Sequence, residues 1–192
     1  MQRREFFRTG FDRMLRGVLE VTDKEVTPTW IRPPFAKPET GFILSCSRCD
    51  RCIAACPRKI LFRLPATAGL KAAGTPAMAL ERGGCHLCSD WPCVAACADG
   101  ALQRPDASPE ASPAPPMLSA ARLDSACCLP YAGPECGACA GSCPVPGALR
   151  WDGPRPVLTV ACVGCGLCRE ACIASPKAIV LARLPEAVSD VA

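Results

Sequence analysis

Cysteine is the residue type that most constrains this chain: 17 of its 192 residues are cysteine, and most follow a regular spacing. The first and the fourth of four cysteine groups have the spacing C-x₂-C-x₂-C-x₃-C, which is typical of the bacterial run that binds [4Fe–4S] clusters. Their members are Cys46, Cys49, Cys52 and Cys56, and Cys162, Cys165, Cys168 and Cys172. The spacing therefore predicts an iron–sulfur protein.

The second and third groups share the final C-x₃-C step but have longer internal gaps. Their members are Cys85, Cys88, Cys93 and Cys97, and Cys128, Cys136, Cys139 and Cys143. The remaining thiol, Cys127, directly precedes Cys128; the spacing favours Cys128 as the ligand, but leaves the choice open. We predict that sixteen cysteines bind four [4Fe–4S] clusters. The fourth cysteine of a group is expected to serve the neighbouring cluster, as in two-cluster ferredoxins.

Two other uses of cysteine fit this pattern less well. A disulfide framework is typical of a short secreted chain with a signal peptide and an even number of cysteines, whereas this chain has 17 and no cleavable apolar leader. Structural zinc also uses C-x₂-C pairs, but usually across a longer gap and often with histidine. The chain has a single histidine, His86. An interaction module stabilised by structural zinc is therefore kept as a third hypothesis, behind two hypotheses in which the cysteines bind iron–sulfur clusters.

Charge and side-chain chemistry exclude other classes of function. The formal net charge of +4 does not indicate a nucleic-acid partner, because four oxidised clusters with their thiolates would bring the total to about −4. The sequence contains no Ser/His/Asp set, phosphate-binding loop or paired acid–base carboxylates, so we expect no catalytic site. His86 is interpreted as a residue beside the ligands or at the surface, and Trp91 as a shield between a cluster and solvent.

Composition divides the rest of the chain. Residues 1–40 combine an amphipathic helix with a proline-rich arm, and residues 3–20 are a candidate docking segment for a partner or a membrane surface. Residues 65–80 are interpreted as an insertion and residues 104–117 as a flexible linker. No run of 18 apolar residues is present, so no transmembrane helix is expected.

The cellular location depends on the first residues. Arg3 and Arg4 resemble a twin-arginine export signal, which needs an uncharged apolar stretch after the arginines. Charged residues interrupt that stretch, which favours a cytoplasmic location, with the periplasm as the alternative.

A short apolar segment follows each cysteine group, as in the ferredoxin half-unit of ligand loop, helical turn and strand. These segments begin at Ile60, Ala101, Ala148 and Ala178. The repetition predicts an α+β fold of two packed bacterial ferredoxin-like modules, each with two [4Fe–4S] clusters, with loop-rich insertions and an N-terminal helix and arm.

Several stretches resemble the ferredoxin-type accessory proteins of the periplasmic nitrate reductase and methylamine-utilisation systems, the NapG, NapF and MauM group. The stretches are residues 31–34 with 42–49, 74–76 with 85–102, and 164–172 with 178–185. The resemblance implies that the first group pairs with the fourth and the second with the third. The modules would then be residues 41–64 plus 155–185, and residues 81–103 plus 118–152.

The implied pairing also implies four ligand sets. They are Cys46, Cys49, Cys52 with Cys172; Cys162, Cys165, Cys168 with Cys56; Cys85, Cys88, Cys93 with Cys143; and Cys128, Cys136, Cys139 with Cys97. The leading hypothesis is a relay of single electrons to or from a partner oxidoreductase, such as a molybdoenzyme or a quinone-linked membrane complex. The alternative is an assembly factor for a molybdenum-containing reductase such as periplasmic nitrate reductase.

Overall fold

A computed structural model describes residues 30–105 and 114–184 of the chain. The expected N-terminal helix, the candidate docking segment 3–20 and the arginine pair lie outside these residues, as does most of the expected linker. The mixture of short helices and strands confirms the α+β class. None of the helices in the described ranges is long and apolar enough to cross a membrane.

All of the regular elements are short. The α-helices are α2 (Glu39–Ser45), α3 (Arg51–Ala55), α4 (Pro92–Ala95), α5 (Leu129–Ala132) and α6 (Leu167–Ala171), with one 3₁₀ turn, η1 (Ala66–Ala68). The strands are β1 (Leu61–Arg63), β2 (Pro76–Met78), β3 (Ala120–Leu123), β4 (Leu149–Asp152), β5 (Arg155–Leu158) and β6 (Ile179–Ala182). Within the described residues they form three antiparallel pairs, β1–β2, β3–β6 and β4–β5.

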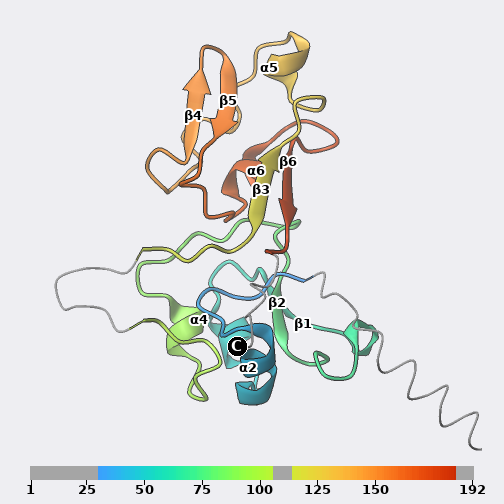
Figure 1. Ribbon diagram of the computed structural model, residues 1–192, viewed down its shortest axis with the longest axis vertical. Coiled ribbons are helices and arrows are strands. Elements are labelled where there is room, and N and C mark those ends of the chain that lie inside the picture. Colours follow the sequence, from blue (N-terminus) through green and yellow to red (C-terminus); the bar gives the residue numbers. More distant parts are fainter. Residues whose placement is uncertain (1–29, 106–113, 185–192) are drawn as a thin grey trace, which may run out of the picture.

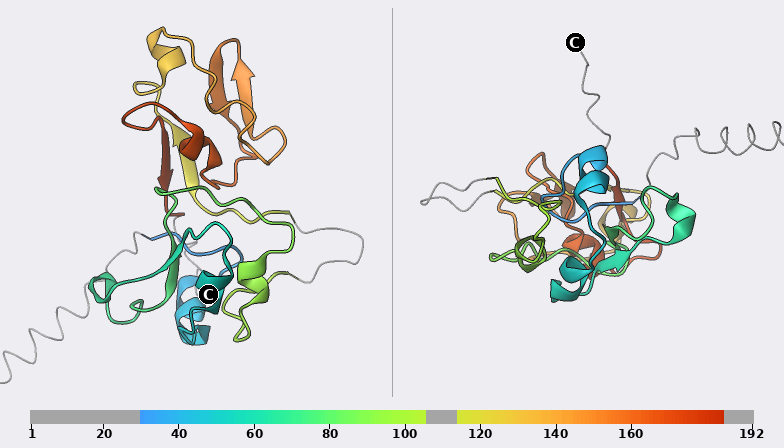
Figure 2. Two further views of the ribbon diagram at one scale, coloured as in Figure 1. Left: turned by 180° about the vertical axis from the view of Figure 1, so that it is seen from behind. Right: turned by 90° about the horizontal axis from the view of Figure 1, so that it is seen from below.

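The elements gather in two parts of the molecule. Helices α2, α3 and α4 and the β1–β2 pair form the lower part in Figure 1, and β3 to β6 with α5 and α6 form the upper part. The view from behind in Figure 2 shows the same division. Strands β3 and β6 bring residues 120–123 against residues 179–182, so the second half of the described chain closes on itself.

Strand β2 corrects one expectation. Residues 65–80 were expected to be an insertion, but residues 76–78 are fully buried and pair with β1, with Phe62 opposite Ala77. Met78 also bridges to Ile31 of the proline-rich arm. The strand begins at Pro76, and the first residue of a strand is a position where proline is tolerated.

The helices that follow the cysteine loops begin in the same way. Residue 50 before α3, residue 91 before α4 and residue 166 before α6 all have a positive φ, and each lies two positions before the third cysteine of its group. Gly166 adopts this left-handed conformation without strain, whereas Asp50 and Trp91 do so with a side chain. The repeat therefore extends from sequence to backbone conformation in three of the four groups.

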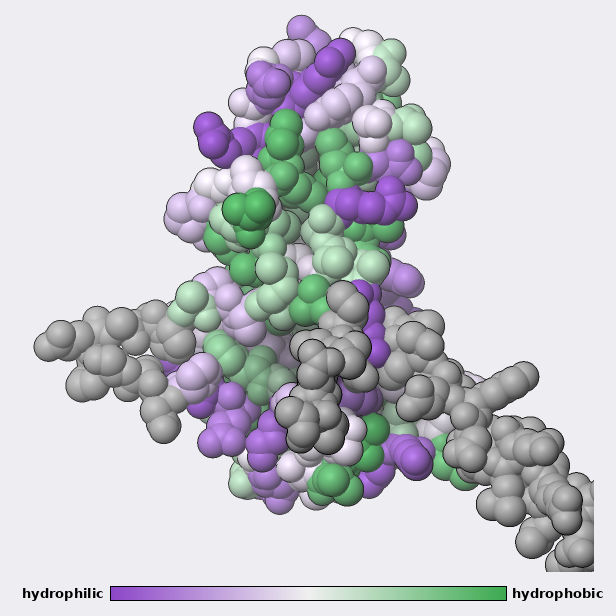
Figure 3. All heavy atoms as spheres, in the orientation of Figure 1, coloured by the Kyte–Doolittle hydropathy of each residue, from purple (hydrophilic) through white to green (hydrophobic). Residues whose placement is uncertain are grey.

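The main core runs through the middle of the molecule. It includes Phe42 and Ile60 from the lower part and Leu118 and Cys165 from the second half of the chain, and all of these are buried. Apolar residues extend from the lower into the upper part on the face seen in Figure 3. The two parts are therefore packed against each other.

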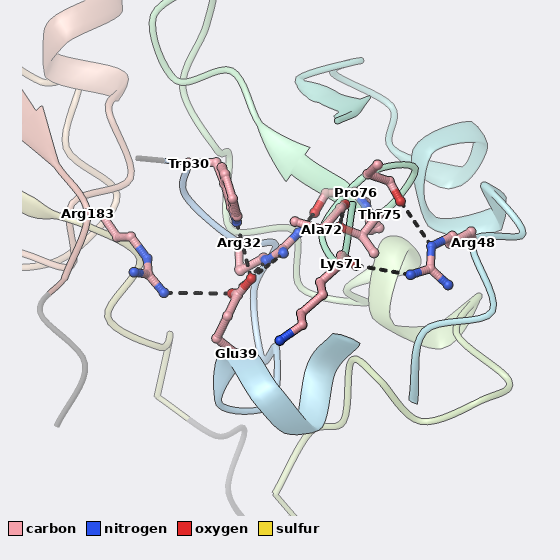
Figure 4. Close-up of polar contacts among 10 residues, drawn as sticks. Trp30, Arg32, Glu39, Arg48, Lys71, Ala72, Thr75, Pro76 and Arg183 are labelled. Carbon is pink, nitrogen blue, oxygen red and sulfur yellow. Dashed lines mark hydrogen bonds and ion pairs between the residues drawn. The ribbon is translucent and has the colours of Figure 1, made fainter. Parts of the chain in front are cut away.

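A buried ion pair anchors the arm to α2. The Arg32 Nε donates a hydrogen bond of 2.9 Å to Glu39 Oε2, and its Nη1 donates to Thr75 and to the Pro76 carbonyl (Figure 4). Burial raises the pKa of the Glu39 carboxyl, but the hydrogen bonds and charge of Arg32 outweigh this effect, so that the pKa lies below its usual value. The Glu39 side chain is only 10% exposed.

We expect Glu39→Gln to lower the free energy of unfolding by about 1–3 kcal/mol at neutral pH, because it leaves the buried Arg32 charge without a carboxylate. Since the Glu39 pKa is lowered, its contribution is complete above the ordinary carboxyl pKa and is lost only as the pH falls through the folded value. Anaerobic urea unfolding should show a constant difference from pH 8 to about 5. The exposed Glu81→Gln is the control. A difference that already shrinks between pH 8 and 6 would contradict the lowered pKa.

Candidate metal centres

Four small cavities in the described residues are each lined by four cysteines. Site A has Cys46, Cys49, Cys52 and Cys97, and site B has Cys56, Cys85, Cys88 and Cys93. Site C has Cys143, Cys162, Cys165 and Cys168, and site D has Cys128, Cys136, Cys139 and Cys172. All sixteen cysteines singled out in the sequence therefore lie in one of four sets of four.

The pairing implied by the resemblance is wrong for this structure. Sites A and B combine cysteines of the first and second groups, and sites C and D combine cysteines of the third and fourth. The reason lies in helix packing: α3 and α4 pack against each other in the lower part. Cys52 in α3 lines site A while Cys56 at its end lines site B, and Cys93 and Cys97 around α4 do the reverse.

The same exchange occurs in the second half of the chain. Cys168 in α6 lines site C, and Cys172 at its end lines site D. Cys139 lines site D and Cys143 lines site C. In both halves the C-x₃-C step spans one short helix or turn, so its two sulfurs lie in adjacent cavities.

Apolar side chains line much of the cavities. Ile60, Leu61 and Met78 line site B, and Leu123 and Ile179 are among the residues that line site D. Cys52, Cys93 and Cys168 are buried, whereas Cys49 of site A is exposed. Half-buried cysteines also line all four sites, so a group held there would be partly shielded from water, and least shielded at Cys49.

Burial also determines the protonation of the thiols. Desolvation raises the pKa of Cys52 and of Cys85 to about 11. Desolvation likewise raises the pKa of Cys93 and of Cys168 to about 12. The exposed Cys49 differs: the backbone amide of Arg51 and the Ser47 hydroxyl lower its pKa. A metal group must therefore displace protons from the buried thiols when it binds.

The cysteines of each site line a cavity and do not converge on a single point in the described residues. In the ranges that the structure describes, no three His, Cys, Asp or Glu side chains are placed so that they could hold one metal ion. A tetrahedral zinc site would place four sulfurs about 2.3 Å from one point. An iron–sulfur cubane instead takes its four thiolates on four separate iron atoms, which matches cysteines that stand around a cavity.

Comparison with curated proteins decides the family. The chain is 34% identical over 159 residues to the methylamine utilization ferredoxin-type protein MauM of Paracoccus denitrificans, covering 78% of this chain and 69% of that protein. It is 33% identical over 162 residues to the ferredoxin-type protein NapG of Escherichia coli, covering 78% and 68% of the two chains. The E. coli ferredoxin-type protein NapF is 31% identical over 173 residues, which cover 84% of this chain and 90% of NapF.

The chain belongs to the NapG, NapF and MauM family of ferredoxin-type proteins. This membership confirms the resemblance seen in the sequence and the predicted class of iron–sulfur, electron-transport protein. No model of a known protein family matches the chain, and no solved structure matches it either.

The remaining candidate residues of this ferredoxin-type chain lie close to the sites. Cys128 lines site D, but Cys127 lines none of the four cavities, which supports the choice made from spacing. Both His86 and Trp91 line site B. Trp91 is only 4% exposed and makes an edge-to-face contact with Phe35, with ring centroids 4.9 Å apart. It therefore covers site B, as expected from the sequence.

Sequence reasoning missed two features of the site environment. The Leu102 backbone N–H donates a hydrogen bond of 3.3 Å to the sulfur of Cys97. Arg48, which lies between two cysteines of site A and lines its cavity, donates hydrogen bonds to the carbonyls of Ala73 and Lys71. Neither contact has a signal in local spacing, because the partner lies elsewhere in the chain or is a backbone group.

Proposed function

We propose that the chain holds one [4Fe–4S] cluster in each of sites A, B, C and D and relays single electrons along the row A–B–C–D. The sixteen cysteines that line the cavities are the proposed ligands. Residues 30–105 and 114–184 would be two ferredoxin-like modules, each with two clusters. The bound clusters supply the one-electron chemistry, and the chain supplies spacing, burial and hydrogen bonds to sulfur.

The order of the sites carries this proposal. Cys52 of site A lies near enough to Cys93 of site B for their charges to interact. Cys85 of site B interacts in the same way with Cys165 of site C. Cys168 of site C does so with Cys139 of site D. The contacts therefore place the four sites in the linear order A–B–C–D, which is the arrangement that a relay requires.

The two ends of the row differ in exposure. Site A has the exposed Cys49, and Leu44 beside it is 81% exposed. Site D lies at the other end, with Trp151, 37% exposed, among its lining residues. We propose that the donor and the partner oxidoreductase meet the chain at these two ends, which leaves sites B and C as internal steps.

Metal analysis of anaerobically purified protein tests the proposal. About sixteen iron and sixteen acid-labile sulfide per chain are expected, because each cubane contributes four of each. The control variant Cys127→Ser should keep the same content, since Cys127 lines no cavity. About eight iron would contradict the four-cluster arrangement, and zinc with little iron would overturn the electron-transfer function altogether.

A further inference from the structure

The two parts of the molecule meet backbone to backbone between sites B and C. The Cys85 N–H donates a hydrogen bond of 2.7 Å to the Cys165 carbonyl oxygen. Cys85 lines site B and Cys165 lines site C, and both residues are buried. This hydrogen bond therefore joins a residue of one proposed cluster site directly to a residue of the next.

Glycine makes this close approach possible. A Cβ atom at Gly84 would lie 2.7 Å from the Leu167 backbone nitrogen and 2.8 Å from its Cα, so no side chain fits there. On the other segment, a Cβ at Gly166 would lie 3.7 Å from the Gly84 Cα. Gly84 has no positive φ, and space alone therefore excludes a side chain at this position.

Side chains hold the contact from both directions. The Gly84 N–H donates a hydrogen bond of 2.7 Å to Glu170 Oε2 in α6. On another side of the interface, Arg183 at the end of β6 lies 3.7 Å from Glu39 in α2 (Figure 4). Residues Val163, Leu167 and Leu181 pack on the core that contains Cys85.

We propose that residues 83–85 and 164–167, which we call the splice, carry the electron between the two parts of the molecule, with Gly84 and Glu170 as the residues that set its spacing. This inference rests on the proposed relay function. One electron leaves the group in site B, which is oxidised, and enters the group in site C, which is reduced; no bond or proton is exchanged. Tunnelling falls steeply with distance, so widening the splice should slow this step while leaving the steps within each part unchanged.

The chain offers a matched pair of variants. Gly84→Ala would push the Leu167 backbone away and lengthen the gap between sites B and C. Gly83→Ala is the control, because its Cβ would meet only Ile60 Cγ2 at 3.4 Å and Glu170 Oε2 at 3.8 Å, which are ordinary contacts. Both positions are free of the positive φ that would strain an alanine.

The experiment attaches the intact holoprotein to an electrode at the site A end. The Leu44→Cys thiol, in a Cys127→Ser background, provides the attachment, and fast voltammetry counts the electrons exchanged per chain. The parent and Gly83→Ala should exchange about four electrons rapidly, and Gly84→Ala only about two, from sites A and B. In solution, dithionite should still reduce all clusters of Gly84→Ala, whose iron content should be unchanged.

The outcomes separate this inference from the proposed function. If the parent exchanges four electrons and Gly84→Ala exchanges them equally fast, the splice is not the crossing point. If the parent lacks four reducible clusters, the relay itself is wrong. Should Gly84→Ala lose iron, the variant Glu170→Ala tests the inference instead. It removes the acceptor of the Gly84 N–H without a clash, and it should slow transfer between sites B and C and speed amide exchange at Gly84. Glu170→Gln keeps an acceptor oxygen and should restore both; wild-type behaviour of Glu170→Ala would overturn the inference.

Discussion

Stripping iron from this chain is expected to unfold nearly all of its described structure. The longest α-helix in residues 30–105 and 114–184 has seven residues, and isolated helices below about 12–15 residues are marginal in water. The sheets in the same ranges have two strands each, which are also marginal without further packing. The buried core contains seven cysteines, so that much of the interior is lining for sites A to D. Without the groups that fill these sites, little packing remains.

The thiol pKa values add to this effect. Burial raises the pKa of Cys93 and of Cys168 to about 12, so without a bound metal group both sulfurs are neutral thiols at physiological pH. Metal binding converts them to thiolates and releases the protons, so the binding free energy becomes folding free energy. Reassembly with iron and sulfide should accordingly be favoured as the pH rises from 6 toward 8.

Far-ultraviolet circular dichroism and amide hydrogen exchange, measured before and after anaerobic oxidation and chelation, would show the change. We expect loss of the strand and helix signals and loss of slow exchange across residues 60–64 and 179–182, with recovery on reconstitution. The chain treated with chelator alone, without an oxidant, is the control for loosely bound metal. Native spectra and a cooperative unfolding transition in the iron-free chain would show that the protein core is sufficient by itself.

The sixteen cysteines that line the four sites could be singled out from the sequence because cysteine spacing is local. C-x₂-C-x₂-C steps mark the first and fourth cysteine groups, and the shared C-x₃-C ending marks the second and third. The strand after the first group, β1, was likewise expected from Ile60–Phe62. Spacing could not show which cysteine groups share a site. That pairing depends on the packing of α3 against α4, and neither helix reveals it in its own sequence.

Non-local contacts explain the other differences. Gly164 is a residue type that favours a left-handed conformation, but Arg48 and Leu87, which also directly precede the second cysteine of their groups, adopt it with a side chain. Arg32 was seen only as part of a proline-rich arm, because its hydrogen bond to Thr75 joins residues 43 positions apart in sequence. Gly84 carried no local signal, since its small size matters only where the Leu167 backbone crosses it.

Loss of one internal cluster is expected to disconnect the row. Cys93→Ser removes a buried sulfur from site B, and a serine hydroxyl is a much poorer ligand for iron than a thiolate. Because site B lies between site A and site C in the proposed row, an electron entering at the site A end would then have to cross to site C without the intermediate step at site B. A gap of that size should stop transfer on the time scale of the other steps.

The same electrode attachment measures this effect, with Leu44→Cys as the only added thiol. The parent should exchange about four electrons rapidly and Cys93→Ser about one, although the clusters in sites C and D remain and can be reduced in solution. The matched control is Cys136→Ser, which removes a cysteine of the terminal site D and should leave about three fast electrons. Equal losses in the two variants would show that the sites exchange electrons independently with the electrode, and the serial order A–B–C–D would be wrong. A loss of three electrons in Cys93→Ser and of a single electron in Cys136→Ser has only one simple explanation. The position of the lost cluster in the row, rather than the number of clusters lost, determines how far an electron travels.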